Sequence, residues 1–223
     1  LVVTVDAPVL GIRRRDLRNR FSVGPEIRWA NLEAYGAAAL SAVDDGTTVA
    51  SYFAEQIDPS VTWADIERIA ASTQLPVLVK GVLRADDAAR AHAVGAAGVY
   101  VSNHGGRQLD RAPATLDALP SIVDRIGDDL DVVVDGGVES GSDIVTALAL
   151  GARAVGLGRV PIRALARGGR AGVVEVFDEI RHEVEHIMRL LGGTALFRLD
   201  RSCLTPAAGT ATTHPQPWRS APL

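Results

Sequence analysis

The stretch GAAGVYVSNHGGRQLD, residues 95–110, joins a helix-ending glycine to a short apolar run and then to a cluster of polar residues. The segment GARAVGLGRVP, residues 151–161, repeats this order of a glycine, a strand-like run and a polar ending. Such a repeated unit is typical of alternating helices and strands, which build a parallel sheet covered by helices. The sequence therefore predicts an α/β fold.

Five runs rich in β-branched residues lack polar alternation and are expected to be buried strands: 1–6, 77–80, 98–102, 131–135 and 154–158. Helical patterns cover 86–94, 115–126 and 142–150, Thr62 and Asp65 are expected to cap a further helix, and an amphipathic outer helix is expected over 172–193. Each expected strand ends in polar residues or glycines. A closed barrel gathers all such ends in one mouth, whereas an open sheet uses mainly one crevice, so the pattern favours a barrel.

Two segments depart from this regular pattern. Residues 28–60 form a long connection of mixed composition, which predicts a functional loop or an insertion. Residues 194–223 are expected to be a tail that is partly disordered or contacts another subunit. The chain begins at Leu1 within an apolar run and its only methionine is Met188, so we expect it to be part of a longer protein.

Composition narrows the function classes. The 223 residues are 47% hydrophobic and 22% charged, which allows one sizeable core. The net charge is −4, the pI is about 5.7 and the arginines are spread along the chain, so nucleic acid is not an expected partner. Cys203 is the only cysteine, which excludes an internal disulfide framework and is typical of a reducing compartment. Without an apolar run of about 18 residues or a signal peptide, we expect a soluble, cytoplasmic protein.

The last two expected strands end in glycine-rich segments, DGGV at 135–138 and GLGR at 156–159, and both lead towards helix starts. Glycine lets the backbone approach an anion, a helix N-terminus offers N–H groups, and Arg159 adds a positive charge. In barrels, the loops after strands seven and eight commonly bind phosphate. These segments therefore predict a phosphate site, although tight turns alone would also use glycine.

Polar side chains at the other strand ends could bind a 2-hydroxy acid by its carboxylate and remove the proton of its hydroxyl. Lys80 is the only lysine of the chain and lies at a strand end, where a compact charge could stabilise a developing anion. His104 can accept a proton near neutral pH, and Asp6 could stabilise its protonated ring. Arg107 and Arg13 could each bind a carboxylate through two parallel hydrogen bonds.

Five ordered motifs carry a resemblance to a known family: TVDAPVLG (4–11), LPVLVKGV (75–82), SNHGGRQLD (102–110), DGGV (135–138) and GLGR (156–159). Together they resemble the FMN-dependent α-hydroxy acid oxidases and dehydrogenases, which include glycolate oxidase, lactate oxidase and mandelate dehydrogenase. The similarity runs from residue 1 to about 193. It implies a (β/α)8 TIM barrel, of which this chain supplies strands four to eight and their helices, with 1–193 as the C-terminal portion of the barrel.

The resemblance also implies residue roles. His104 is implied as the active-site base, Asp6 as its partner, Arg107 and Arg13 as the substrate's carboxylate ligands, and Lys80 as the residue that stabilises the reduced flavin. The residues implied to bind FMN are Thr4, Lys80, Ser102, Asp135, Gly136, Gly137, Gly158 and Arg159. The implied reaction gives a 2-oxo acid by hydride transfer to flavin N5, or by a carbanion route that uses the same residues, with dioxygen or another acceptor reoxidising the flavin in a homotetramer.

Two positions depart from the family pattern. Glu139 stands where relatives often have arginine after DGGV, and an acid beside a phosphate is unfavourable. Phosphate binding is then expected to rely on backbone N–H groups and Arg159, or Glu139 points outward. Ile12 replaces another frequent arginine, which leaves Arg13 as the carboxylate ligand on that loop.

Two other functions compete with this interpretation. His182, Glu183 and His186 form the sequence HEVEH, the spacing of a zinc metalloprotease helix, although no third-ligand signature follows it and the apolar stripe of the helix places the trio on the solvated side. A non-catalytic barrel half is the other alternative, because strands one to three are missing from the sequence. The substrate's side chain is left open.

Overall fold

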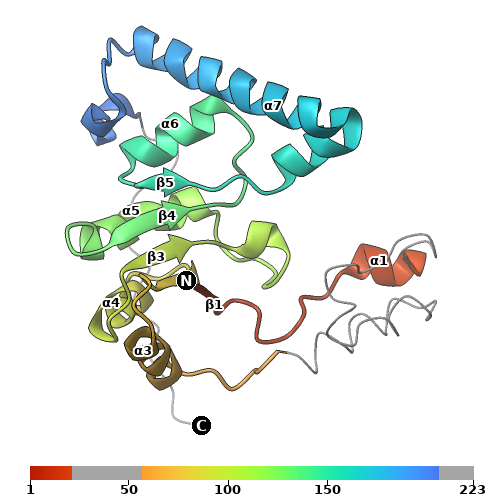
Figure 1. Ribbon diagram of the computed structural model, residues 1–223, viewed down its shortest axis with the longest axis vertical. Coiled ribbons are helices and arrows are strands. Elements are labelled where there is room, and N and C mark those ends of the chain that lie inside the picture. The colour runs from red at the N-terminus through yellow and green to blue at the C-terminus, as the bar shows by residue number, and fades with distance from the viewer. Residues whose placement is uncertain (22–56, 206–223) are drawn as a thin grey trace.

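The computed structural model describes residues 1–21 and 57–205 (Figure 1). In this part of the chain, five parallel strands form one sheet in the order β1-β2-β3-β4-β5. Their bounds are Val2–Thr4 (β1), Leu78–Val82 (β2), Gly98–Val101 (β3), Asp131–Val134 (β4) and Ala154–Val155 (β5). The spatial order follows the chain, without the reversal that defines a doubly wound sheet. The expected strands are confirmed, although β2 continues past Lys80 and β5 is shorter than expected.

Helices connect consecutive strands and cover the sheet. Their bounds are Arg14–Asn19 (α1), Trp63–Ser72 (α3), Ala85–Ala93 (α4), Thr115–Ile126 (α5), Gly141–Ala149 (α6) and Arg159–Leu190 (α7). Helix α3 begins at the capping box expected from the sequence, where the Asp65 carboxylate accepts a hydrogen bond of 2.7 Å from the Thr62 backbone N–H. Helices α4 and α5 contact each other, and α7 packs on α6 outside the sheet (Figure 1).

Two helices differ from the expectation. Helix α7 begins at Arg159, directly after the last strand, and breaks at Gly169, where φ is +58°. Its apolar stripe is only partly covered, since Ile180 and Met188 are buried while Phe177 is 48% exposed. Helix α1 was not expected, because its six residues, RRDLRN, show no apolar periodicity and no side chain caps its start.

The two faces of the sheet differ in burial. Val79, Val99 and Val134 are fully buried, and they pack with Leu119 and Ile122 of α5 in the hydrophobic core. The opposite face carries a row that crosses the sheet in register through Thr4, Lys80, Tyr100, Val133 and Ala154, and none of these side chains is fully buried. The strands therefore bury most of one face, on which Val3 and Val155 are partly buried, and leave polar groups accessible on the other. This differs from the expectation that both faces are apolar.

The two irregular segments lie partly outside the described residues. The structure does not describe most of the expected loop over 28–60 or the tail beyond Thr205. The described beginning of the tail contacts the body of the protein, because Arg201 Nη1 lies 2.7 Å from the Asp124 carboxylate of α5. Of the helices in the described ranges, none combines the length and the apolar character needed to cross a membrane.

Candidate functional site

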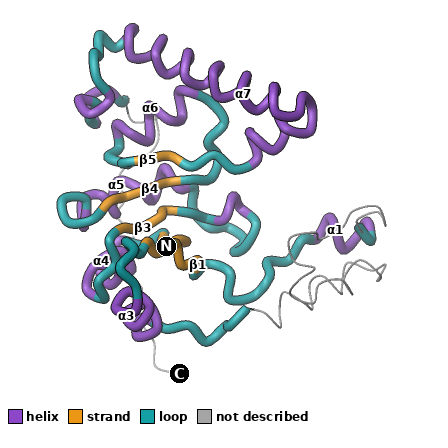
Figure 2. The backbone as a smooth tube through the Cα atoms, viewed as in Figure 1, coloured by secondary structure: helices purple, strands orange, loops and turns teal. Residues whose placement is uncertain are grey.

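A cavity of about 270 Å³ opens beside the carboxyl ends of β2, β3, β4 and β5. Most of the residues that line it lie in the segments that follow β3, β4 and β5. Figure 2 shows these connecting loops on the same side of the sheet. The residues that line it are Lys80, His104, Gly105, Arg107, Asp135, Gly136, Gly137, Val138, Glu139, Gly156, Gly158, Arg159 and Val160. The cavity therefore gathers residues from four of the five motif segments, as a barrel mouth predicts.

At one end of the cavity, His104 is held by Asp6. Its Nδ1 lies 3.0 Å from Asp6 Oδ1, and the Asp6 carboxylate comes from the loop after β1. An ionised carboxylate only accepts hydrogen bonds, so Nδ1 carries the proton of a neutral ring and Nε2 is left as the basic nitrogen. Gly81 of β2 lets Asp6 lie close to this strand, because φ there is +106° and a Cβ atom would lie 2.5 Å from the Asp6 Cβ.

The backbone of the histidine loop is held in an unusual conformation. His104 has φ of +57°, in the left-handed region that residues other than glycine rarely adopt. The Ser102 hydroxyl accepts a hydrogen bond of 3.1 Å from the His104 N–H, and the Asn103 side chain accepts one of 3.2 Å from the Gly106 N–H. These two contacts offset the cost of the conformation and direct the imidazole towards the cavity.

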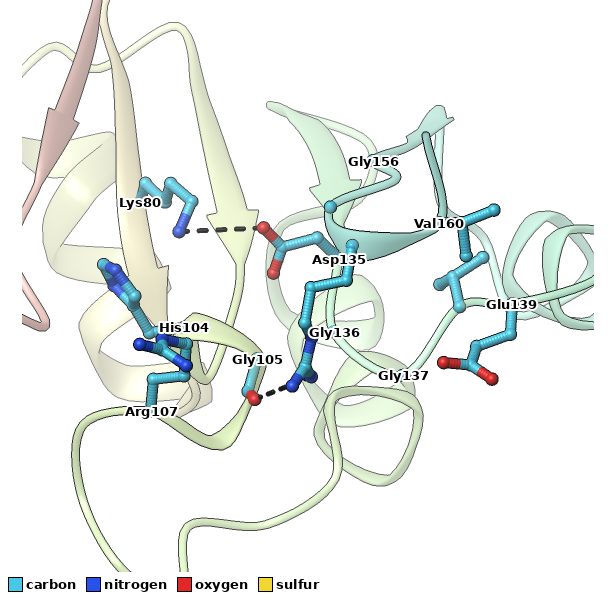
Figure 3. Close-up of a pocket in the computed structure, with 13 residues that line it drawn as sticks. Lys80, His104, Gly105, Arg107, Asp135, Gly136, Gly137, Glu139, Gly156 and Val160 are labelled. Carbon is cyan, nitrogen blue, oxygen red and sulfur yellow. Dashed lines mark hydrogen bonds and ion pairs between the residues drawn. The ribbon is translucent and has the colours of Figure 1, made fainter. Parts of the chain in front are cut away.

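Lys80 of β2 contacts both the histidine loop and Asp135, the residue directly after β4. Its ammonium lies 3.6 Å from Asp135 Oδ2 (Figure 3). It also donates to the Ser102 hydroxyl at 2.9 Å and is 5.5 Å from the centre of the Tyr100 ring. Ser102 is fully buried, and the side chains of Lys80 and Asp135 are about four-fifths buried, at 18% and 21% exposed. Burial, and to a lesser extent the Asp135 carboxylate, raises the pKa of Tyr100 above its ordinary value.

We call His104, Asp6, Lys80 and Ser102 the histidine end of the cavity. Figure 3 shows His104 and Arg107 on the same side of it. Four residues expected at the site do not line the cavity: Asp6 contacts His104 from the loop after β1, Thr4 is exposed at the end of β1, Ser102 is buried next to Lys80, and Arg13 precedes α1. The buried Arg13 Nε has no hydrogen-bond partner among the described residues.

At the other end, backbone groups dominate. We call Gly136, Gly137, Gly158 and Arg159 the glycine end. Gly136 and Gly137 have φ of +88° and +80°, and no atom lies within 4 Å of a Cβ position at Gly137 or Gly158. The Arg159 guanidinium donates to the Gly105 carbonyl at 3.1 Å, which connects this end to the histidine loop. Open backbone beside one cation suits a bound anion.

Only one of the two nearby helix N-termini is open for an anion. The start of α6 is closed, because the Ser140 hydroxyl accepts from the Asp143 N–H and the Glu183 carboxylate accepts from the Gly141 N–H at 2.5 Å. The start of α7, after Gly158, has no side-chain cap among the described residues. The sequence did not distinguish these two helix starts. The structure favours α7, because its first-turn N–H groups lack such a competitor.

Glu139, which departs from the family pattern, does line the cavity. Its carboxylate lies 2.7 Å from Arg163 Nη2 of α7, and both side chains are at least half exposed. Arg163 thus balances the negative charge of Glu139 next to the glycine end. The sequence did not point to Arg163, because it is separated from Glu139 by a strand and lies in a helix that was expected to begin later.

The HEVEH sequence lies in α7, away from the cavity. His182 and His186 are exposed, as expected, whereas the Glu183 carboxylate contacts the start of α6. Glu183 is also exposed, as expected, but the sequence did not predict its contact with α6. A carboxylate bound to a backbone N–H at a helix start has a structural role there, because it satisfies one of the unpaired donors of α6.

Comparisons with known proteins agree with the site. The FMN-dependent dehydrogenase family matches residues 1–206. The chain is 46% identical to an L-lactate oxidase of Nostoc sp. over 204 residues, which are 92% of this chain and 56% of that protein. It is 44% identical to 2-hydroxyacid oxidase 1 of Homo sapiens over 195 residues, 86% of this chain and 52% of that protein. The chain thus spans about half the length of the curated relatives that it matches.

Solved structures give the same result. A chimera of (S)-mandelate dehydrogenase aligns with a TM-score of 0.79 at 38% identity, over 92% of this chain and 57% of that one. A mandelate oxidase aligns with a TM-score of 0.75 at 38% identity, over 90% and 53%. These matches support the flavin interpretation and not the metalloprotease alternative, and they confirm FMN as the cofactor of the family. The chain belongs to the FMN-dependent dehydrogenase family.

Proposed function

We propose that the protein oxidises a 2-hydroxy acid to the 2-oxo acid with FMN bound in the cavity. The observation that carries this proposal is the convergence, in one cavity, of an aspartate-paired histidine, the only lysine of the chain and an open glycine-rich anion site. We also infer that β1 to β5 are strands four to eight of a (β/α)8 barrel. The sequential strand order and the polar, incompletely buried face of the sheet support this inference.

The residues of the cavity fit FMN. Asp135 Oδ1 is buried and has no partner among the described residues, which suits a hydroxyl donor such as the ribityl chain. Gly136, Gly137 and Gly158, with Arg159 and the open start of α7, would hold the phosphate. Lys80, with Thr4 at the end of β1 and Ser102 directly after β3, would hold the flavin ring, and bound FMN supplies the two-electron acceptor for the reaction.

The chain's own residues account for the proton chemistry. His104 Nε2 accepts the proton of the substrate hydroxyl as the α-hydrogen leaves with its electron pair, and the hydroxy acid becomes the oxo acid. Asp6 keeps the proton on Nδ1 and stabilises the imidazolium that forms. Arg107, together with Arg13, binds the substrate carboxylate, and the Lys80 ammonium stabilises negative charge next to it.

Several features of the whole protein stay predictions. Dioxygen is the proposed electron acceptor, because relatives are named oxidases. The sequence-based expectations of a homotetramer, of a cytoplasmic location and of an additional barrel portion have no test in the described residues. The substrate's side chain is likewise open between the aliphatic and aromatic acids on which the relatives named lactate oxidase and mandelate oxidase act.

Anaerobic mixing tests the proposed function. The FMN-loaded protein is mixed with glycolate, lactate or mandelate in a stopped-flow instrument, and the absorbance of oxidised flavin is followed while the oxo acid is measured. We expect one of the three acids to bleach the flavin with one equivalent of oxo acid per FMN. A protein that does not bind FMN, or that binds it and is bleached by none of these acids, would contradict the proposal.

A further inference from the structure

We propose that Gln108 is a positioning residue that clamps the loop after β1 to the loop after β3 and thereby fixes Asp6 against His104. The clamp itself is a property of the flavin-free protein. Its catalytic consequence rests on the proposed function, in which His104 is the base and Asp6 orients it.

The side-chain amide of Gln108 makes three hydrogen bonds to one loop. Its Nε2 donates to the backbone carbonyls of Asp6 at 3.3 Å and of Val9 at 3.0 Å. Its Oε1 accepts from the Gly11 N–H at 2.9 Å. Gln108 is partly buried and does not line the cavity. A single side chain therefore satisfies three backbone groups of the segment between β1 and α1.

Gly11 provides a second observation that the two loops are closely packed. A Cβ atom at this position would overlap the Arg107 carbonyl oxygen and would lie 2.8 Å from both the Cα and the Oε1 of Gln108. Because the overlap is with backbone atoms, it cannot be relieved by a rotamer change. The contact thus requires glycine on one loop and a glutamine on the other.

The clamp lies between the residues that the mechanism must align. Asp6 and Arg13 belong to the loop that Gln108 holds, whereas His104 and Arg107 belong to the loop that carries Gln108. The His104 side chain is joined to that loop by the 3.0 Å hydrogen bond to Asp6. Small displacements of a catalytic group are costly, so a residue that fixes the loop spacing affects the rate without touching the substrate.

The chemistry of the clamp requires an amide. Two of the three partners are carbonyl oxygens, which need N–H donors, and the third is an N–H group, which needs an acceptor. An ionised glutamate offers only acceptors and leucine offers neither. Gln108→Leu therefore removes the clamp, and Gln108→Glu keeps the contact to Gly11 but loses both contacts to the carbonyls.

The experiment compares these variants with Gln74→Leu, a matched change at an exposed glutamine between α3 and β2. Hydrogen exchange of a peptide that covers residues 5–12 is measured in the flavin-free proteins, and flavin reduction is measured in the FMN-loaded proteins. In Gln108→Leu, we expect the amides of residues 5–12 to exchange about 10-fold faster. We expect its rate of flavin reduction at saturating substrate to fall by about 10- to 100-fold. FMN affinity should stay within about twofold, because Gln108 does not line the cavity, and Gln74→Leu should change nothing.

The glutamate variant separates a donor role from mere packing. Its reduction rate, divided by that of the original protein at the same pH, should rise as the pH is lowered from about 7 to about 4.5, near the ordinary pKa of a glutamate, because a protonated carboxyl regains one donor. A ratio that does not change with pH, unchanged exchange over 5–12, or an unchanged rate in Gln108→Leu would each overturn the proposal. If no substrate reduces the FMN of the original protein, the proposed function is wrong. The hydrogen-exchange data then still decide whether the clamp exists.

Discussion

The histidine end and the glycine end of the cavity are built in different ways. The histidine end consists of side chains from three strands or their loops, and its charges have partners: His104 with Asp6, and Lys80 with Ser102 and Asp135. The glycine end consists of backbone in left-handed conformations, the uncapped start of α7 and one exposed cation. The first end can hold and move a proton, whereas the second can only hold an anion.

This contrast determines how each end responds to substitution. At the histidine end, each side chain either takes part in the proposed proton chemistry or holds a side chain that does. Replacing one of these side chains also leaves its partner without a hydrogen bond. At the glycine end, the N–H groups are present whatever the side chains are, so backbone conformation should matter more than charge. Exposed ion pairs contribute little free energy in water. We therefore expect the smallest effect on FMN affinity from the Glu139–Arg163 pair.

The largest effect is expected at His104. Replacing it with alanine removes the base that accepts the hydroxyl proton, so flavin reduction should slow by about 10²- to 10⁴-fold. FMN affinity should change little, because the phosphate ligands lie at the other end. Stopped-flow reduction and an FMN titration measure the two quantities. His92→Ala, at an exposed histidine of α4, is the control. A His104→Ala variant that reduces FMN at the original rate would remove the chemical distinction between the two ends.

A smaller effect is expected at Lys80. Lys80→Met removes the partner of Asp135 and of the buried Ser102 hydroxyl, so the unfolding free energy of the flavin-free protein should fall by about 1–3 kcal/mol. Urea denaturation measures this difference. Arg68→Met is the control, because Arg68 is 74% exposed in its ion pair with Asp65 and should cost less than about 1 kcal/mol. Equal losses in both variants would show that the burial of the Lys80 contacts has no energetic consequence.

Gly137→Ala tests the backbone of the glycine end. The new methyl group has space, so the cost comes from φ at +80° and should be about 1–2 kcal/mol. We expect the loop to relax, to turn its N–H groups away and to lose about 10-fold in FMN affinity. Gly95→Ala has a matched φ of +84° and open space, but it lies before β3, at the opposite end of the sheet. It should lose similar stability with no change in FMN affinity. If both variants bind FMN equally well, the glycine loop is not an anion site.

The smallest effect is expected for the ion pair next to the glycine end. Arg163→Gln leaves the Glu139 carboxylate unbalanced at the cavity wall and should weaken FMN binding by less than about fivefold. The double variant with Glu139→Gln should recover the affinity, and 0.5 M salt should reduce the difference. FMN titrations of the single and double variants measure this coupling. Affinity that stays low in the double variant would mean that Arg163 contacts the phosphate itself.

The sequence predicted which residues gather at the two ends of the cavity better than it predicted the contacts that hold them there. Lys80 lies in β2, Asp6 and His104 follow the ends of β1 and β3, and strand order brings such residues to one edge of the sheet. It could not show that Glu183, far along α7, caps α6, because that contact depends on how two helices pack. The partners of Ser102 and the contacts of Gln108 were missed for the same reason. Short elements without periodicity, such as α1, leave no pattern to detect.

A crystal structure of the protein with FMN tests the orientation on which both ends depend. We expect the phosphate to lie on the N–H groups of Gly137 and the start of α7 beside Arg159, and the isoalloxazine ring to lie next to Lys80, on the side of His104. A phosphate at the histidine end, or FMN bound outside the cavity, would contradict the account.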